Sequence, residues 1–341
     1  MTERSGEKAV AMPRAALGIL FVVICTLFPS LNVTADAQQQ KKAPRVGLLL
    51  QGTHSSLATR IEGFQQGLRE HGYVENKNLI LVPRFDDDTE ERLRHLALEL
   101  VRLRVDIIVA AATPAVIAAK QATATIPIVF VHSADPVALG LVATLAQPGG
   151  NITGLSSASP DYSSKQLELL KEAFPGLSRV ALLWNAANPG TAVTFRELQE
   201  AAQAFKLRTD SLEIQRSEDL PSAFKKVSKQ PGTGLVTLLD PLVVSQRARI
   251  VELAAESRVP AIYPQKEFVE GGGLMAYGAD LSESYRRAAK FVDKILKGAK
   301  PGELPVEYPT KFIFTVNLKA AKQIGLIIPP NVLARADRVI K

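Results

Sequence analysis

The chain alternates short apolar runs with longer segments that have helical periodicity, and this alternation limits its fold more than any other feature. In the first helical segment, Leu57, Ile61, Phe64 and Leu68 recur at the spacing of one helix face. Repeated strand–helix units predict parallel sheets with helices on both faces. The predicted strands are 45–50, 79–84, 105–110, 128–131, 152–154, 179–184, 209–214, 234–239, 260–263, 274–277 and 312–316, and the helices between them include 114–122, 137–145, 191–205, 220–228, 245–257 and 281–297.

The alternation restarts near residues 154–159, and a chain of 341 residues is long enough for two domains. Two such runs predict two doubly wound α/β lobes. An open parallel sheet binds its ligand beyond the carboxyl ends of its strands. Two facing lobes would therefore form a central cleft, a common place for a small ligand.

The N-terminal segment has the three parts of a secretory signal peptide. Arg4, Lys8 and Arg14 precede an apolar run at 15–28, and small residues stand on either side of Asp36 in the segment 35–37. We expect cleavage after Ala37 and export to the periplasm. An uncleaved membrane anchor is the alternative, although the run is shorter than the roughly 20 residues that span a bilayer.

The single cysteine, Cys25, lies inside this apolar run. A lipidation site requires a small residue just before the cysteine, and Ile24 is not small. If cleavage follows Ala37, the mature chain has no cysteine and forms no disulfide. A thiol nucleophile and a zinc–thiolate site are then excluded as well.

The formal net charge of +7 does not predict a nucleic-acid partner. The first 37 residues contain three basic and three acidic groups, so the mature chain keeps the same charge. Lysine and arginine are scattered beside acidic residues along the predicted helices, without interleaved aromatic residues. No segment after the N-terminal run is apolar enough to cross a membrane.

Sequence motifs for catalysis or cofactor binding are missing. The first strand is followed by the segment 51–56, which is not a G-x-G-x-x-G loop, and the chain has neither a P-loop nor a G-x-S-x-G elbow. We therefore expect no catalytic residue and no cofactor.

The sequence does not predict a metal site either. The four histidines, His54, His71, His95 and His132, are too dispersed for a spaced metal motif. The acidic run 86–88 is compatible with a divalent cation, but a solvated loop before the next helix explains it better. His54 and His132 fall at strand ends, where a cleft can use them to contact a ligand.

An ordered set of short motifs resembles one protein family from about residue 44 to the C-terminus. The motifs are TPA at 113–115 with AAK at 118–120, IPIVF at 126–130, DPV at 135–137, QPGGNITG at 147–154, WN at 184–185, GGGL at 271–274 and LARAD at 333–337. They resemble the ABC-transporter substrate-binding family, whose better-known members resemble tryptophan- and aromatic-amino-acid-binding lipoproteins.

The resemblance implies the type I periplasmic-binding architecture, in which two doubly wound parallel-sheet lobes surround a central cleft. It also implies three crossings between the lobes, which we place near 154–157, 278–281 and 308–311. The lobes would then be 44–155 plus 281–310 and 156–280 plus 311–341. Because the chain lacks a convincing lipidation motif, we expect a free periplasmic monomer that delivers its ligand to permease subunits in the inner membrane.

The turns after the strands are expected to line the cleft, at 53–56, 113–115 and 132–135 in the first lobe and at 185–191, 240–243 and 263–265 in the second. A helix N-terminus with nearby hydroxyl groups suits a ligand carboxylate, and Asp240 would accept from a ligand ammonium. Several of these side chains have alternative roles: the hydroxyls and Asp135 can cap helices, Asp240 can start a turn, and the two tyrosines can pack the hinge. The candidate ligand-binding residues are Thr53, Ser55, Ser56, Thr113, Pro114, Ala115, His132, Asp135, Asn185, Asp240, Tyr263 and Tyr277.

These features predict a non-enzymatic solute-binding protein of an ABC importer that closes on an amino-acid-like ligand, with aromatic amino acids among the candidates. Closure would present a composite surface to the permease. A ligand-sensing subunit of a membrane receptor would use the same two-lobed fold and is the first alternative. An exported α/β enzyme is the second, and it would need a nucleophile–base pair in the cleft.

Overall fold

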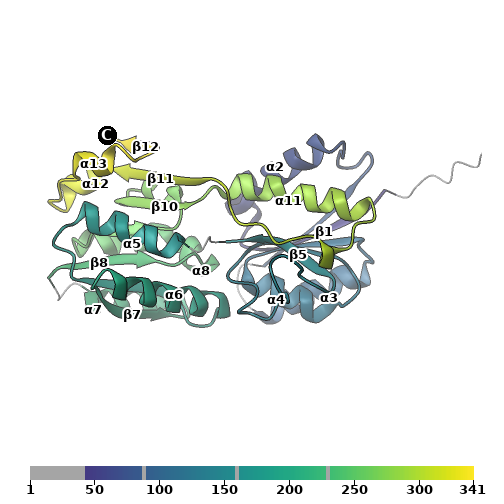
Figure 1. Ribbon diagram of the computed structural model, residues 1–341, viewed down its shortest axis with the longest axis horizontal. Coiled ribbons are helices and arrows are strands. Elements are labelled where there is room, and N and C mark those ends of the chain that lie inside the picture. The colour runs from purple at the N-terminus through teal and green to yellow at the C-terminus, as the bar shows by residue number, and fades with distance from the viewer. Residues whose placement is uncertain (1–42, 87–89, 158–160, 228–230) are drawn as a thin grey trace, which may run out of the picture. The chain divides into compact units, whose positions relative to one another are not determined.

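The structure is a computed structural model that describes residues 43–86, 90–157, 161–227 and 231–341. The predicted signal peptide and the acidic residues at 87–88 lie outside these ranges. The described chain contains two sheets, each covered by helices on both faces (Figure 1). This confirms the predicted doubly wound α/β class.

The first sheet is fully parallel and has the strand order β2-β1-β3-β4-β5. Its central strands are apolar and buried, as expected for strands covered on both faces. Helices α2 and α11 cover one face, and α3 and α4 cover the other. The elements are β1 (Arg45–Gln51), α2 (His54–Glu70), β2 (Ile80–Asp86), α3 (Glu90–Arg102), β3 (Ile107–Ala111), α4 (Thr113–Ala122), β4 (Ile128–Ser133), β5 (Ile152–Ser156) and α11 (Leu281–Leu296).

The second sheet has seven strands in the order β12-β11-β10-β9-β8-β6-β7. Its strands are β6 (Arg179–Asn185), β7 (Arg208–Ile214), β8 (Thr233–Thr237), β9 (Ala261–Tyr263), β10 (Met275–Ala279), β11 (Phe312–Asn317) and β12 (Arg338–Ile340). Its helices are α5 (Tyr162–Ala173), α6 (Pro189–Ala204), α7 (Leu220–Val227), α8 (Pro241–Ser245), α9 (Arg247–Glu256), α10 (Lys266–Glu270), α12 (Leu318–Gln323) and α13 (Pro330–Leu333), with short 3-10 helices at Ser217–Asp219 and Pro301–Glu303.

One strand pair departs from the parallel pattern, because β10 and β11 are antiparallel. After β10 the chain leaves the second sheet, forms α11 against the first sheet, and returns. It re-enters beside the point where it left, since Phe312 pairs with Ala279. A strand that starts at the end of its neighbour must run in the opposite direction.

The prediction of a helix at 137–145 is wrong, and this segment forms successive turns. Gly140 has a left-handed φ of 63°, and the N–H groups of Leu141 and Val142 both donate to the carbonyl of Pro136. Lys120 donates to the carbonyls of Gly140 and Leu141, which a helix would have satisfied internally. The turns bury Leu141 and Val142 in the core, so tertiary burial overrides the local apolar pattern.

The predicted helix at 245–257 is observed as α9, and the separate short helix α8 that precedes it was not predicted. The short elements α10, α13 and β12 were not predicted from the sequence. Within the described residues, no helix is both long and apolar enough to span a bilayer.

Helix α11 packs directly on α2, and two glycines of α2 make the close approach possible. A Cβ atom on Gly63 would lie 2.5 Å from the carbonyl oxygen of Ser282. A Cβ atom on Gly67 would lie 2.2 Å from the carbonyl oxygen of Arg286. Both obstacles are backbone atoms, so a side chain at either position would push the helices apart.

We therefore expect Gly67→Ala to destabilise the protein by about 1–3 kcal/mol through overpacking. Helix propensity alone predicts the opposite sign, a gain of about 1 kcal/mol. Equilibrium urea unfolding measures the difference. Glu62→Ala, at an exposed position of α2, is the control and should change stability by less than about 0.5 kcal/mol. An increase in stability for Gly67→Ala would contradict the close packing.

Candidate functional site

A cavity of about 750 Å³ lies between the two sheets, at the carboxyl ends of their strands. The turns after β1, β3 and β4 form one wall, and the turns after β6, β7, β8 and β9 form the other. Helix α11 contributes Leu281 and Tyr285. The volume falls in the range of small-molecule sites, and the location is the one expected for open parallel sheets.

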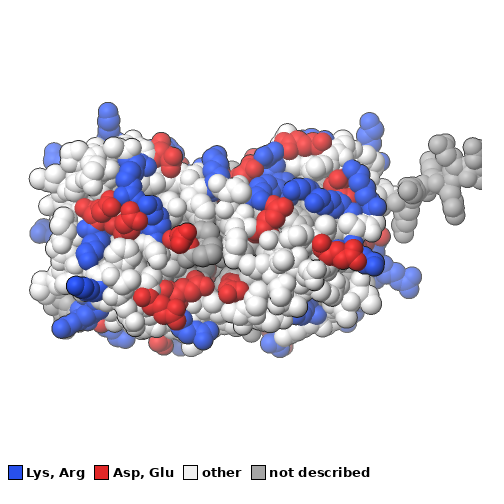
Figure 2. All heavy atoms as spheres, viewed as in Figure 1, with Lys and Arg blue, Asp and Glu red and all other residues white. Residues whose placement is uncertain are grey.

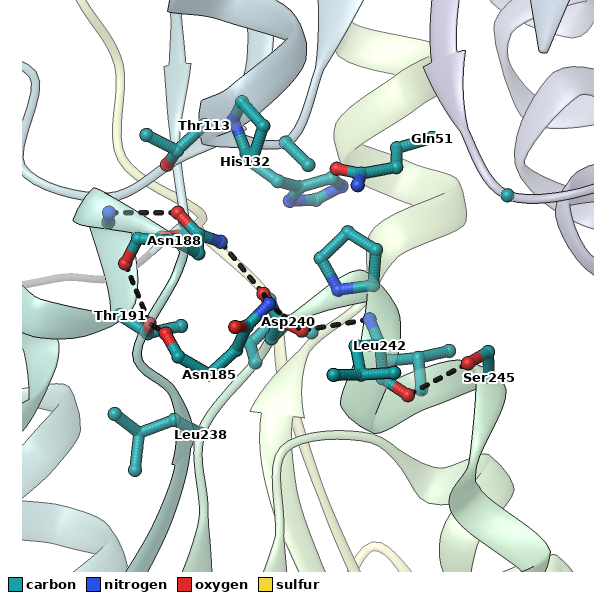
Figure 3. Close-up of a pocket in the computed structure, with 18 of the residues that line it drawn as sticks. Gln51, Thr113, His132, Asn185, Asn188, Thr191, Leu238, Asp240, Leu242 and Ser245 are labelled. Atoms are coloured by element: carbon teal, nitrogen blue, oxygen red, sulfur yellow. Dashed lines mark hydrogen bonds between the residues drawn. The ribbon is translucent and has the colours of Figure 1, made fainter. Parts of the chain in front are cut away.

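Asp240 organises the wall formed by the second sheet (Figure 3). It is only 1% exposed, and its Oδ1 accepts from the backbone N–H groups of Leu242 at 2.8 Å and Val243 at 3.3 Å. Its Oδ2 accepts from Nδ2 of Asn188 at 2.8 Å, and Nδ2 of Asn185 lies 3.2 and 3.3 Å from the two oxygens. Burial raises the pKa of Asp240, and the hydrogen bonds oppose this rise.

These contacts give Asp240 a positioning role. It caps α8 and orients Asn185 and Asn188 toward the cavity, and Asn188 in turn caps α6 by accepting from the N–H of Gly190. Because both carboxylate oxygens already accept hydrogen bonds from the protein, Asp240 has little remaining capacity for a ligand ammonium.

His132 projects into the cavity from the opposite side (Figure 3). It is 8% exposed, has a left-handed φ of 60°, and lies 5.4 Å from the ring of Tyr285, measured between centroids. Burial, with a smaller contribution from the charge of Arg60, lowers the pKa of His132 to about 3. The imidazole is therefore neutral near pH 7, with one nitrogen that donates and one that accepts.

Several buried polar atoms of the cavity wall have no hydrogen-bond partner among the described residues. They are both ring nitrogens of His132, Oε1 of Gln51, Oγ1 of Thr237 and Nε2 of Gln265. Native proteins pair the great majority of such atoms. Their convergence on one cavity from both sheets is typical of a wall that binds a polar ligand.

Arg60 supplies a positive charge beside His132. It is half-buried, and its guanidinium donates to Oε1 of Gln265 at 3.3 Å and to the hydroxyl of Tyr285. The other basic residues of the wall, Arg216 and Arg247, are exposed.

The structure places seven of the predicted residues in the cavity wall: Thr53, Ser56, Thr113, Pro114, His132, Asn185 and Asp240. Thr53 and Ser56 also form the capping box of α2, each accepting from the backbone N–H of the other. Oγ1 of Thr113 accepts from the N–H of Ala134 and so ties the turns after β3 and β4 together.

Five predicted residues are not part of the wall. Ser55 is exposed and bonds to the hydroxyl of Thr53. Ala115 is fully buried in the core beside the first sheet. Asp135 caps its own turn by accepting from the N–H groups at positions 137 and 138. The two tyrosines, Tyr263 and Tyr277, also lie outside the wall.

Both tyrosines pack within the protein. Tyr263 is 1% exposed and stacks on Phe268. Tyr277 stacks on Tyr162 and Phe312 beside the point where the chain crosses between the sheets. The hinge-packing alternative therefore describes Tyr277.

Sequence reasoning missed several residues of the wall, among them Gln51, Arg60, Thr237 and Tyr285. Asn188 and Gln265 lie in the turns 185–191 and 263–265, which were expected to line the cleft, but neither residue was named as a ligand contact. Gln51 ends an apolar strand, and this position was a usable signal. Arg60 and Tyr285 lie on helices, where nothing in the pattern separates them from other surface residues.

The molecular surface mixes both signs of charge (Figure 2). Basic side chains gather over α11 on the face shown, but ion pairs offset them. Arg286 pairs with Glu70 and Glu283, and Arg287 pairs with Glu307. This arrangement agrees with the expectation of a mixed solvated surface.

Comparison with known proteins identifies the family. The model of the ABC transporter substrate binding protein family matches residues 45–340. The chain belongs to this family. Proteins of this family bind solutes outside the cytoplasm, in the periplasm or at the cell surface.

Individual relatives agree with this assignment. A tyrosine-binding protein of Clostridioides difficile is 26% identical over 298 residues, which cover 85% of this chain and 84% of the relative. A structure from Streptococcus pneumoniae in complex with L-Trp has a TM-score of 0.81 and 27% identity, and the match covers 87% of this chain and 99% of the other. A conserved domain protein from Vibrio cholerae matches with a TM-score of 0.82 and 30% identity, covering 87% and 100% of the two chains.

The lowered pKa of His132 predicts a specific loss of stability in acid. The unfolded chain takes up a proton on this histidine below pH 6.5, but the folded chain does not until the pH approaches 3. The free energy of unfolding therefore falls as the pH drops through this window, by about 1.4 kcal/mol per pH unit. His132→Asn removes the titrating group, and asparagine tolerates the left-handed backbone.

When the pH is lowered from 7 to 4.5, the free energy of unfolding should fall by about 2–3 kcal/mol less for His132→Asn than for the parent protein. Chemical unfolding at both pH values measures this. His95→Asn, at an exposed position of α3, should follow the parent. Parallel curves for the parent and His132→Asn would show that the folded state accommodates a charged His132.

Proposed function

We propose that this chain is the ligand-binding component of an ABC importer and that it binds an amino acid, aromatic in the first instance, between its two sheets. The observation that supports this most is the cavity at the facing carboxyl edges, into which both sheets direct buried polar atoms without protein partners. The relatives that bind tyrosine and L-Trp support the choice of ligand class.

Binding without chemistry is the interpretation that the cavity favours. A hydrolytic site needs a nucleophile within hydrogen-bond reach of a base. His132 is the histidine of the cavity wall, and neither of its ring nitrogens is hydrogen-bonded to a described residue. Among the described wall residues, His132 is therefore not paired with a nucleophile, and its ring nitrogens are available to a bound ligand.

We further propose that the lobes are 44–155 plus 281–310 and 156–280 plus 311–341, and that they close on the ligand. The contacts that join the halves around the cavity include a hydrogen bond from Arg60 to Gln265 and the close approach of Gly190 in α6 to Thr113 in α4. A ligand that contacts both walls stabilises the closed form and shifts the population toward it. The closed form would then dock on the permease.

The proposed cellular setting follows from the N-terminal sequence. Cleavage after Ala37 would release a free periplasmic monomer, and the ligand would pass to permease subunits in the inner membrane. Mass spectrometry of the mature protein tests the cleavage site.

A thermal-shift screen of residues 38–341, unfolded and refolded to remove copurified ligand, tests the ligand class. We expect tyrosine or tryptophan to raise the unfolding midpoint, because a ligand at a hundredfold excess over Kd stabilises the folded state by about 2.7 kcal/mol. Sugars, nucleosides and simple carboxylates serve as comparison classes. A shift with sugars alone, or with none of these compounds, would overturn the amino-acid proposal.

Closure can be tested at Gly190, where a Cβ atom would lie 2.4 Å from Oγ1 and 2.9 Å from Cβ of Thr113. We expect Gly190→Ala to hold the lobes apart and to weaken ligand binding about 5- to 100-fold, the equivalent of 1–3 kcal/mol of overpacking. Calorimetric titration measures the change. Gly176→Ala is the control, because that position is exposed and has room for a methyl group. Equal affinities for all three proteins would contradict closure at this contact.

A further inference from the structure

The cavity wall distributes its charges unequally, and this suggests how a ligand is oriented. Five charged residues line the cavity among those described. Arg216, Glu218 and Arg247 are exposed, and the buried carboxylate of Asp240 is occupied by protein donors. Arg60 is therefore the half-buried charge that no opposite charge offsets: among the described residues, no aspartate or glutamate forms an ion pair with it.

Hydrogen-bond donors gather around this charge. Gln265 is 3% exposed, and because its Oε1 accepts from Arg60, its Nε2 remains as an unpaired donor. His132 is 8% exposed, and one of its two unpaired ring nitrogens carries a proton. Tyr285 links the two residues, because Arg60 donates to its hydroxyl and its ring lies 5.4 Å from that of His132, measured between centroids. A cation and two further donors thus converge at one end of the cavity.

A carboxylate matches this set of groups. It carries one negative charge, as the single arginine requires, and its two oxygens offer about four acceptor positions. Hydrogen bonds between arginine and a carboxylate are charge-assisted and stronger than those between neutral groups. The remaining unpaired atoms nearby, Oε1 of Gln51 and the unprotonated nitrogen of His132, are acceptors and suit an adjacent ammonium group.

We propose that Arg60, Gln265 and His132 form a carboxylate subsite that fixes the head group of the ligand and joins the two lobes. This inference rests on the proposed function, because it takes the ligand to be an amino acid. Arg60 lies on α2, which covers the first sheet, and His132 lies at the end of β4 in that sheet, whereas Gln265 follows β9 of the second sheet. A carboxylate held by all three residues contacts both lobes, so recognition and closure depend on the same group.

Calorimetric titration with matched ligand pairs tests the subsite. Each amino acid that binds the purified protein is compared with its carboxamide, which lacks the negative charge. We expect the parent protein to bind the free acid more tightly, and we expect Arg60→Gln to weaken binding of the acid about 10- to 100-fold while changing binding of the amide less than about threefold.

A second variant keeps the test informative if Arg60→Gln folds poorly. Gln265→Glu places a carboxylate beside Arg60, which pairs the cation internally and repels the ligand carboxylate. It should lower the affinity for the acid and spare the amide. Arg69→Gln is the matched control, because it removes the same charge from an exposed position of α2 outside the cavity.

The outcomes separate this inference from the proposed function. Suppose that the parent binds amino acids, but that Arg60→Gln and Gln265→Glu either weaken binding of the acid and the amide equally or weaken binding of neither. The carboxylate subsite is then wrong, and the proposed function stands. If the parent binds no amino acid, the function fails, and the same variants are titrated with 3-phenylpropionate and its amide. Selective loss of the acid then supports the subsite, whereas binding of neutral ligands alone, or of neither compound, overturns it.

Discussion

Two sheets that face each other with the carboxyl ends of their parallel strands determine the rest of this structure. A strand in a parallel sheet is followed by a turn at that edge and then by a helix that covers the sheet. When two such edges face each other, the turns of both sheets meet around one space. In this protein the space is a cavity of about 750 Å³, and segments that follow strands of both sheets line it. Polar side chains at the strand ends can therefore line the cavity without entering either hydrophobic core.

The unpaired polar groups in this cavity lower the stability of the folded protein. A buried polar atom without a partner costs about 1–3 kcal/mol. His132, Gln51, Thr237 and Gln265 each contribute at least one such atom. Asp240 is different, because the protein satisfies both of its oxygens and uses them to hold Asn185 and Asn188 in place. The wall thus combines fixed side chains with groups that are ready for a partner, which is the preorganisation that a selective binding site needs.

Much of the fold could be predicted from the sequence, because apolar strands and amphipathic helices follow local periodicity. The exception at 137–145 shows the limit of that approach. Its apolar residues have helical spacing after Asp135-Pro136, but Gly140 takes a left-handed conformation and the core buries Leu141 and Val142. The antiparallel direction of β11 depends on where the chain returns from α11. Local periodicity does not predict that connection.

The site was predictable at the level of turns but not of individual side chains. The turn at 263–265 was correctly placed after a strand, yet Tyr263 points into the core and Gln265 lines the cavity. Asp240 was expected to contact the ligand, but in the structure its oxygens accept hydrogen bonds from neighbouring amides. Arg60 lies on a helix face like many other arginines, and only the packing of α2, α11 and the second sheet places it beside His132 and Gln265. Such positions depend on tertiary packing.

A crystal structure of the protein bound to the amino acid that it selects would test the central claim most directly. We predict one ligand in the cavity, in contact with residues from both sheets: His132 and Arg60 on one side, and Gln265 and the wall around Asp240 on the other. A ligand held by one sheet alone, or bound outside the cavity, would contradict it.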